Sequence, residues 1–160
     1  MLDKLFVTDF DGTLTKFDFY RLAIERLIPE DCPDYWRDYR RGELTHFEAL
    51  NKYFNAIRAT EREMADLLVR MELEPRLADC VTRLKDAGWE IVVTSAGCSW
   101  YIDRLLSSVN VNLKVYANPG TFSPETGLVM FPPTESRYFS RDLGIDKAEV
   151  VRDALRDGGT

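Results

Sequence analysis

The sequence predicts an α/β fold: a Rossmann-like parallel sheet with a helical module inserted after its first strand. From residue 75 onward, short apolar runs alternate with amphipathic stretches, a rhythm that is typical of parallel sheets. The stretch 17–74, which follows the first apolar run, is helical in pattern throughout. With 160 residues, 45% of them apolar and 12% aromatic, the chain can bury a sizeable core and is too apolar to be disordered.

The first strand is expected at residues 5–8, where an apolar run ends in a polar turn. Two of the helices that follow are marked by capping boxes, in which a Thr side chain and a Glu three residues later satisfy free backbone N–H groups. These boxes begin at Thr45 and Thr60, and each introduces an apolar face. An earlier amphipathic stretch is also expected, and the residues of its apolar face are Phe17, Tyr20, Leu22, Ile24 and Leu27.

After Pro75 the elements are expected to alternate regularly. In order, they are a helix that ends at Gly88, a strand at 90–94, a helix through Tyr101–Leu106, a strand at 113–117, a hairpin at 121–131 and a helix from Asp146 to about Gly158–Gly159. Glycine suits the position after a helix because it adopts the left-handed conformation without strain. Strands joined through helices in this way form a parallel sheet.

Charge and composition exclude several classes of protein. The formal net charge of −6 argues against general binding to nucleic acid backbones. No apolar run approaches the ~18 residues of a membrane span. The three cysteines, Cys32, Cys80 and Cys98, are odd in number and widely spaced, which is typical of reduced thiols in the cytoplasm. We therefore expect a cytoplasmic protein with no nucleic acid or membrane partner, and the sequence assigns no oligomeric state.

Two carboxylates, Asp9 and Asp11, directly follow the first expected strand and precede Gly12 and Thr13. A turn at the carboxyl end of a strand can aim both side chains into the crevice where open α/β sheets bind ligands. Two close carboxylates repel each other unless a cation or a shared proton compensates, so the pair indicates a metal or acid–base site. The alternative is a plain turn in which Asp, Gly and Thr supply only turn chemistry.

Two further signals lie later in the chain. Ser95-Ala96-Gly97 stands between a strand and a helix, where backbone N–H groups are free to hold an anion. An ordinary turn with Ser95 as the helix N-cap is the alternative. Lys147 lies in the first turn of the last helix, where a cation opposes the helix dipole, which indicates a role other than a structural one. A solvated lysine is the alternative there.

In this order, the three signals resemble the motifs of the haloacid-dehalogenase-like superfamily of phosphotransferases. Residues 9–15, Asp-Phe-Asp-Gly-Thr-Leu-Thr, match the first motif, while Ser95 matches the second and Lys147 the third. The helical block between the first two motifs is similar to the α-helical cap of the phosphoserine-phosphatase-like subclass. Residues 116–119 and 143–147 resemble the branch of 2-hydroxy-3-keto-5-methylthiopentenyl-1-phosphate phosphatases. The resemblance implies a core of residues 1–16 and 75–160 with a cap of residues 17–74.

The same resemblance implies a Mg²⁺-dependent phosphatase that hydrolyses a small-molecule phosphate monoester through an aspartyl-phosphate. It implies Asp9 as the nucleophile and Asp11 as the general acid and base, with Mg²⁺ held by Asp9 and Asp11. The implied phosphate-binding residues are Ser95, Ala96, Gly97 and Lys147, and the implied substrate contacts from the cap are Asp18 and Tyr20. Asp18 stands where phosphoserine phosphatases use a longer Glu, which argues against phosphoserine itself. His46, the single histidine, is expected to be exposed.

The superfamily also has a fourth motif, an acidic cluster after a further strand, which supplies additional Mg²⁺ ligands. Lys147 is followed by 13 residues, in which Asp157-Gly158-Gly159 is interpreted as a helix end. We therefore expect a family member cut short before that motif, with weak Mg²⁺ binding, poor turnover of phosphate esters and self-association through an uncovered first strand. Two other functions stay open: a catalytically impaired fragment or pseudoenzyme that keeps the phosphate site, and a phosphotransferase that uses an acceptor alcohol.

Overall fold

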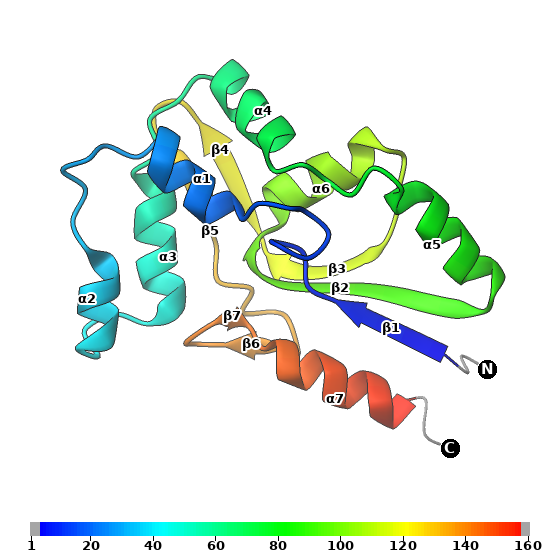
Figure 1. Ribbon diagram of the computed structural model, residues 1–160. Coiled ribbons are helices and arrows are strands. Elements are labelled where there is room, and N and C mark those ends of the chain that lie inside the picture. The colour runs from blue at the N-terminus through cyan, green and yellow to red at the C-terminus, as the bar shows by residue number, and fades with distance from the viewer. Residues whose placement is uncertain (1–3, 158–160) are drawn as a thin grey trace.

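The computed structural model describes residues 4–157 and contains a three-stranded parallel sheet (Figure 1). Its strands are β1 (Lys4–Thr8), β2 (Trp89–Cys98) and β3 (Lys114–Asn118), hydrogen-bonded in the order β1-β2-β3. Val7 pairs with Val92, and Val93 pairs with Val115. The predicted α/β class is therefore confirmed. Within residues 4–157, β1 pairs with β2 alone.

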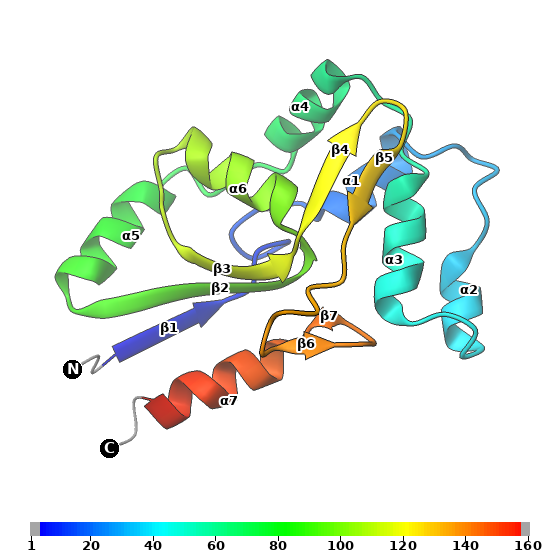
Figure 2. The same ribbon diagram turned by 180° about the vertical axis from the view of Figure 1, so that it is seen from behind.

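Helices cover both faces of this sheet, as Figures 1 and 2 show. Helices α5 (Leu77–Asp86) and α6 (Ser99–Ser108) lie on one face, and α7 (Lys147–Asp157) lies on the other. The side chains of β2 alternate accordingly. Ile91 and Val93 belong to the large core shared with α5 and α6, whereas Val92 packs with Val150 of α7. The helix end expected at Gly88 is confirmed, and that glycine has a φ of +82°.

Four helices fill the inserted block between β1 and α5. They are α1 (Phe19–Arg26), α2 (Tyr35–Arg40), α3 (His46–Asn55) and α4 (Glu61–Arg70). Both expected capping boxes are present, at the N-termini of α3 and α4. The expected apolar face of the first helix is right for Leu22, which is buried, and wrong for Phe17 and Ile24, which are 40% and 39% exposed. Helix α1 begins only at Phe19, so spacings of three and four residues place Phe19 and Ala23 in the core beside Leu22.

The chain enters and leaves the helical block through two antiparallel segments. The N–H of Lys16 donates to the carbonyl of Glu72 at 3.0 Å, and the N–H of Glu74 donates to the carbonyl of Leu14 at 2.9 Å. A single β-bridge, Thr15 with Leu73, lies between these bonds. These bonds support the proposal that the core and the cap meet at residues 16–17 and again at residues 74–75.

The expected hairpin is confirmed as β4 (Gly120–Ser123) and β5 (Gly127–Met130), and it packs against α3 (Figure 2). The side chain of Asn51 on α3 makes two hydrogen bonds to the backbone of Met130, at 2.8 and 3.2 Å. A Cβ at Gly127 would lie 2.8 Å from the carbonyl oxygens of Phe54 and Asn55. This close approach requires a glycine, and it joins the inserted helices to a hairpin that follows β3.

A second, smaller hairpin, β6 (Phe139–Ser140) with β7 (Gly144–Ile145), precedes α7 and was not expected. The carboxylate of Asp146 accepts a hydrogen bond from the N–H of Glu149 at 3.0 Å, as expected for the N-terminus of this helix. The expected end at Gly158–Gly159 lies outside the described residues. No helix in the part of the chain that is described has the length and apolarity needed to cross a membrane.

Candidate active site

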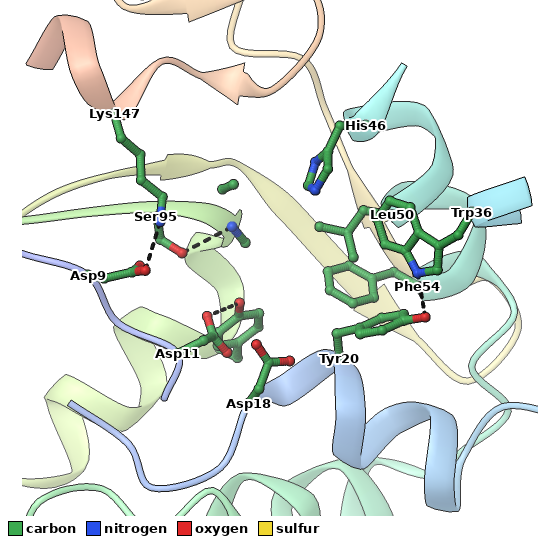
Figure 3. Close-up of a pocket in the computed structure, with 13 residues that line it drawn as sticks. Asp9, Asp11, Asp18, Tyr20, Trp36, His46, Leu50, Phe54, Ser95 and Lys147 are labelled. Atoms are coloured by element: carbon green, nitrogen blue, oxygen red, sulfur yellow. Dashed lines mark hydrogen bonds and ion pairs between the residues drawn. The ribbon is translucent and has the colours of Figure 1, made fainter. Parts of the chain in front are cut away.

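A pocket of about 200 Å³ lies where the carboxyl ends of β1 and β2 face the inserted helices (Figure 3). It brings together all eight residues that the sequence singled out. From the core side these are Asp9, Asp11, Ser95, Ala96, Gly97 and Lys147, and from the helical block they are Asp18 and Tyr20. Tyr101, Trp36, His46, Leu50 and Phe54 complete the lining. Residues far apart in the chain therefore share the crevice that an open α/β sheet offers to ligands.

Asp9 and Lys147 form an ion pair at the carboxyl end of β1. Oδ2 of Asp9 lies 2.8 Å from Nζ of Lys147, and Oδ1 accepts the backbone N–H of Phe10 at 2.8 Å. The two side chains keep 43% and 37% of their surface exposed, so the pair stays open to the pocket. This contact places the first residue of α7 beside β1 although 138 residues separate them.

Asp11 is held more tightly than Asp9. Its Oδ1 accepts the N–H of Phe19 at 2.9 Å, and its Oδ2 accepts the hydroxyl of Tyr101 at 2.7 Å. Burial raises the pKa of Asp11 to about 6, against the effect of both hydrogen bonds; the nearby carboxylates of Asp18 and Asp9 raise it further. A carboxyl group with a pKa near 6 can both give and take a proton close to neutral pH.

Tyr101 also belongs to the site, although its role was not predicted from the sequence. Its ring is buried and stacks on Phe19, with centroids 4.3 Å apart and planes 6° from parallel. Its hydroxyl reaches Asp11 over Gly97, where a Cβ would overlap the Tyr101 hydroxyl and lie 3.2 Å from Oδ2 of Asp11. Gly97, four residues before Tyr101, is the sequence feature that could have indicated this contact, because a glycine leaves room for the Tyr101 side chain.

The loop Ser95-Ala96-Gly97 differs from its expected form. Strand β2 continues to Cys98 with a register shift against β3, and α6 begins only at Ser99. Ser95 is therefore not the helix N-cap, and the loop does not form the first turn of the helix. The N–H of Gly97 donates to Oγ of Ser95 at 3.0 Å, so it is already used within the loop. The expectation of a strand ending at residue 94 was wrong because the bulged extension keeps pairing with Asn118.

Substituting Gly97 tests this packing. We expect Gly97→Ala to destabilise the fold by about 1–3 kcal/mol, since the new methyl group overlaps the hydroxyl of Tyr101. In a Tyr101→Phe background the same substitution should cost less, because the overlapped oxygen is gone, although Cζ of the ring still lies 3.0 Å from the new Cβ. Urea denaturation of the two single variants and the double variant measures this. Purely additive losses would contradict the proposed overlap.

Asn118, fully buried at the end of β3, joins two parts of the site. Its Nδ2 donates to the carbonyl of Ala96 at 2.9 Å and to that of Leu143 at 3.4 Å. A Cβ at Gly144, where φ is +78°, would overlap the Asn118 side chain. Asn118 thus fixes the bulged end of β2 relative to the segment that leads into Lys147. The sequence pointed to this region only through its resemblance to a phosphatase branch.

On the side of the inserted helices, two residues have structural partners as well. Asp18 is the N-cap of α1 and accepts the N–H of Arg21 at 3.1 Å. The hydroxyl of Tyr20 accepts the indole N–H of Trp36 at 2.6 Å, as Figure 3 shows. His46 is partly buried and lines the pocket, so its expected exposure was wrong. The turn between β6 and β7 contacts the N-terminus of α3, where Asp142 accepts the backbone N–H groups of His46 at 3.0 Å and Phe47 at 2.7 Å.

Possible metal ligands are few. Within residues 4–157, no group of three or more His, Cys, Asp or Glu side chains is arranged to hold an ion. Asp9 and Asp11 nevertheless line one pocket with carboxylate and backbone oxygens, which are the hard donors that Mg²⁺ prefers. Mg²⁺ commonly keeps several waters and binds through one or two carboxylates, so this donor set fits such an ion in kind.

The family of the chain follows from comparison with known proteins. Residues 6–150 match the family model of haloacid dehalogenase-like hydrolases. The chain therefore belongs to this family, as the order of its motifs indicated.

Two curated proteins and one solved structure are similar to most of the chain. The chain is 22% identical over 147 residues to the 2-hydroxy-3-keto-5-methylthiopentenyl-1-phosphate phosphatase of Brevibacillus brevis, covering 90% of this chain and 66% of that protein. It is 27% identical over 159 residues to the phosphoserine phosphatase of Archaeoglobus fulgidus, covering 98% of this chain and 44% of that protein. A solved phosphoserine phosphatase with a phospho-aspartyl intermediate analogue matches with a TM-score of 0.62 at 16% identity, over 99% of this chain and 74% of that one. The chain thus spans about half to two thirds of the length of these curated relatives.

Proposed function

We propose that the chain carries the active site of a Mg²⁺-dependent phosphatase that hydrolyses a small phosphate monoester through an aspartyl-phosphate at Asp9. The observation that carries this proposal is one pocket with an open carboxylate, a lysine ammonium at 2.8 Å from it, and a second carboxyl group whose pKa is about 6. A nucleophile, a cation for phosphoryl oxygens and an acid–base group are the parts that two-step phosphoryl transfer needs. The names of the relatives support the same reaction class.

In the first step, a carboxylate oxygen of Asp9 forms a bond to phosphorus while the bond to the ester oxygen breaks. Asp11 gives its proton to the departing oxygen and becomes a carboxylate. In the second step, water attacks phosphorus as Asp11 takes a proton from it, and the bond to Asp9 breaks. Inorganic phosphate leaves, and both aspartates return to their starting states.

The remaining core residues hold the phosphoryl group during both steps. Lys147 supplies positive charge, and Ser95 and the N–H of Ala96, whose residues line the same pocket, bind phosphoryl oxygens in this proposal. Asp9 and the backbone carbonyl of Asp11 would hold Mg²⁺, which adds further positive charge against the oxygens when bound. The N–H of Gly97 already donates to Ser95, which orients that hydroxyl.

The pocket also restricts the substrate. A volume of about 200 Å³ suits a small leaving group. Lys147 is the one Lys or Arg among the described lining residues, and it pairs with Asp9, so a substrate carboxylate would lack a partner. This supports an ester other than phosphoserine.

Cys32, Cys80 and Cys98 are all free thiols, which supports a cytoplasmic protein.

Phosphate release tests the proposed activity. We expect the chain to release phosphate from an aryl phosphate in the presence of Mg²⁺, and to stop when the ion is chelated. Asp9→Asn, purified in parallel, controls for contaminating phosphatases. Transfer of the phosphoryl group to added alcohols in place of water would establish a phosphotransferase. No release above the control, with phosphate still bound, would establish a non-catalytic phosphate-binding protein and contradict the proposal.

A further inference from the structure

His46 is the first residue of α3, and it lines the pocket across from Lys147 (Figure 3). Its ring lies against Trp36 and Tyr39, with ring centroids 5.1 and 5.8 Å away. Its backbone N–H donates to Oδ1 of Asp142 at 3.0 Å, and this bond fixes the N-terminus of α3 against the core. The imidazole is therefore held in a defined position in the pocket, although neither step of the proposed reaction uses it.

The two ring nitrogens of His46 differ in their surroundings. Nδ1 is shielded from solvent and has no hydrogen-bond partner within residues 4–157. Buried N–H groups without an acceptor are rarer in proteins than buried acceptors without a donor. The proton of the neutral ring therefore belongs on Nε2, with Nδ1 left as a bare acceptor. Burial lowers the pKa of His46 from its ordinary value; Asp142 acts in the opposite direction, and Lys147 lowers the pKa by a smaller amount, so the neutral form of the ring is favoured.

Because Nδ1 is shielded while the residue lines the pocket, we assign the edge that bears Nε2–H to the pocket side of the ring. This group is a single neutral donor, which suits one oxygen acceptor. Its neighbours on the same wall, Leu50 and Phe54, have no polar side-chain atoms to compete for that acceptor. Lys147 and Ser95, which the proposed function assigns to the phosphoryl oxygens, lie on the opposite side of the pocket from His46. On that assignment, the leaving group is the part of the ester that faces His46.

We infer that Nε2–H of His46 donates to a hydroxyl or carbonyl oxygen on the leaving group, next to the phosphate, and so selects esters that carry such an oxygen. The inference rests on the proposed function, because the leaving group belongs to the phosphate ester. An ester without that oxygen leaves the His46 donor unpaired beside the apolar side chains of Leu50 and Phe54, and an unpaired buried donor is a strong source of discrimination.

Nuclear magnetic resonance tests the inference without relying on turnover, because His46 is the only histidine in the chain. We expect the imidazole nitrogens of the untagged Asp9→Asn variant to show the neutral Nε2–H tautomer. Dihydroxyacetone phosphate, which has a carbonyl beside the ester carbon, should shift Nε2. Propyl phosphate, which lacks it, should leave Nε2 nearly unchanged while still shifting the backbone amides of residues 95–97.

The outcomes separate this inference from the proposed function. Amide shifts at residues 95–97 without a His46 response, equal His46 responses to both esters, or an Nδ1–H tautomer would each overturn the inference alone. Absence of amide shifts with either ester would overturn the proposed phosphate site as well. Equal responses would mean that His46 contacts the phosphate and not the leaving group.

Two variants give a kinetic test with a matched control. The amide nitrogen of Gln can stand near the Nε2 position, whereas that of Asn stands near Nδ1. We expect His46→Asn to lower kcat/KM for dihydroxyacetone phosphate by about 10–100-fold, and His46→Gln to retain most of it. Both variants should change kcat/KM for propyl phosphate much less. Equal losses for the two esters, or no rescue by Gln, would contradict a donor at Nε2; circular dichroism confirms that both variants fold.

Discussion

Asp9→Asn is expected to lower the phosphatase turnover by at least ~10³-fold, the scale of losing a covalent catalyst. The substitution is nearly isosteric, but an amide oxygen is a poor nucleophile toward phosphorus. Steady-state release of phosphate with Mg²⁺ present measures the effect. Turnover within ten-fold of the native chain would exclude Asp9 as the nucleophile.

The fold of this variant should survive, which keeps the kinetic result interpretable. Oδ1 of an Asn at position 9 can still accept the N–H of Phe10, as Oδ1 of Asp9 does at 2.8 Å. The lost ion pair with Lys147 is partly exposed, and such pairs contribute little to stability. Unchanged circular dichroism and an unfolding midpoint close to that of the native chain are the expected controls.

Asp11→Asn is expected to change activity and stability in opposite directions. Loss of the acid–base group should lower turnover by about 10²–10⁴-fold. At pH 7 to 8, however, the variant should be more stable than the native chain by roughly 2–3 kcal/mol, because a buried charge is removed. The isosteric amide keeps Oδ1 available to the N–H of Phe19, and the hydroxyl of Tyr101 can rotate to accept from Nδ2.

The gain in stability expected for Asp11→Asn depends on pH. The pKa of Asp11 rises from 3.8 to about 6 on folding, so its protonation favours the folded state. The stability that it contributes is fully present below pH 3.8 and is lost as the pH rises through 6. The difference in unfolding free energy between variant and native chain should therefore grow from pH 4 to pH 7. A constant difference, or an equal rise for Asp9→Asn at its more exposed position, would contradict burial as the cause.

Much of the site was predictable because its signals are local in the sequence. Asp9 and Asp11 stand two residues apart after an apolar run, and Lys147 opposes a helix dipole. Each feature can be recognised without knowing what lies across the pocket. Their order along the chain then identified the family, and the alternation of elements identified the sheet.

The residues that were missed act through tertiary contacts. The sequence pattern shows Tyr101 only as an ordinary apolar-face residue of a helix. Its contact with Asp11 arises from the fold, which brings the Tyr101 hydroxyl to that carboxylate. Asn118 matters because two carbonyls from other segments converge on it. His46 was expected to be exposed because a capping box describes only its own helix, and the docking of Asp142 on that helix cannot be read from local pattern.

Local boundaries caused the remaining errors. The sequence pattern placed Phe17 on the buried face of the first helix, but α1 begins at Phe19, and Phe19 is the buried residue. The set of residues on one helical face depends on where the helix begins. The extension of β2 to Cys98 depends on pairing with Asn118 of the neighbouring strand, which the apolar run 91–93 does not reveal. In both cases the element type was right and its end was decided by packing.

Asp9 is the residue that carries the phosphoryl group in the proposed reaction, and chemical trapping can detect that intermediate. The chain is mixed with an aryl phosphate and Mg²⁺, quenched during turnover, and treated with borohydride, which reduces an aspartyl-phosphate to homoserine. Peptide mapping by mass spectrometry should then find homoserine at position 9, and at no other position. Modification at another residue, or steady turnover without any modified peptide, would contradict the account.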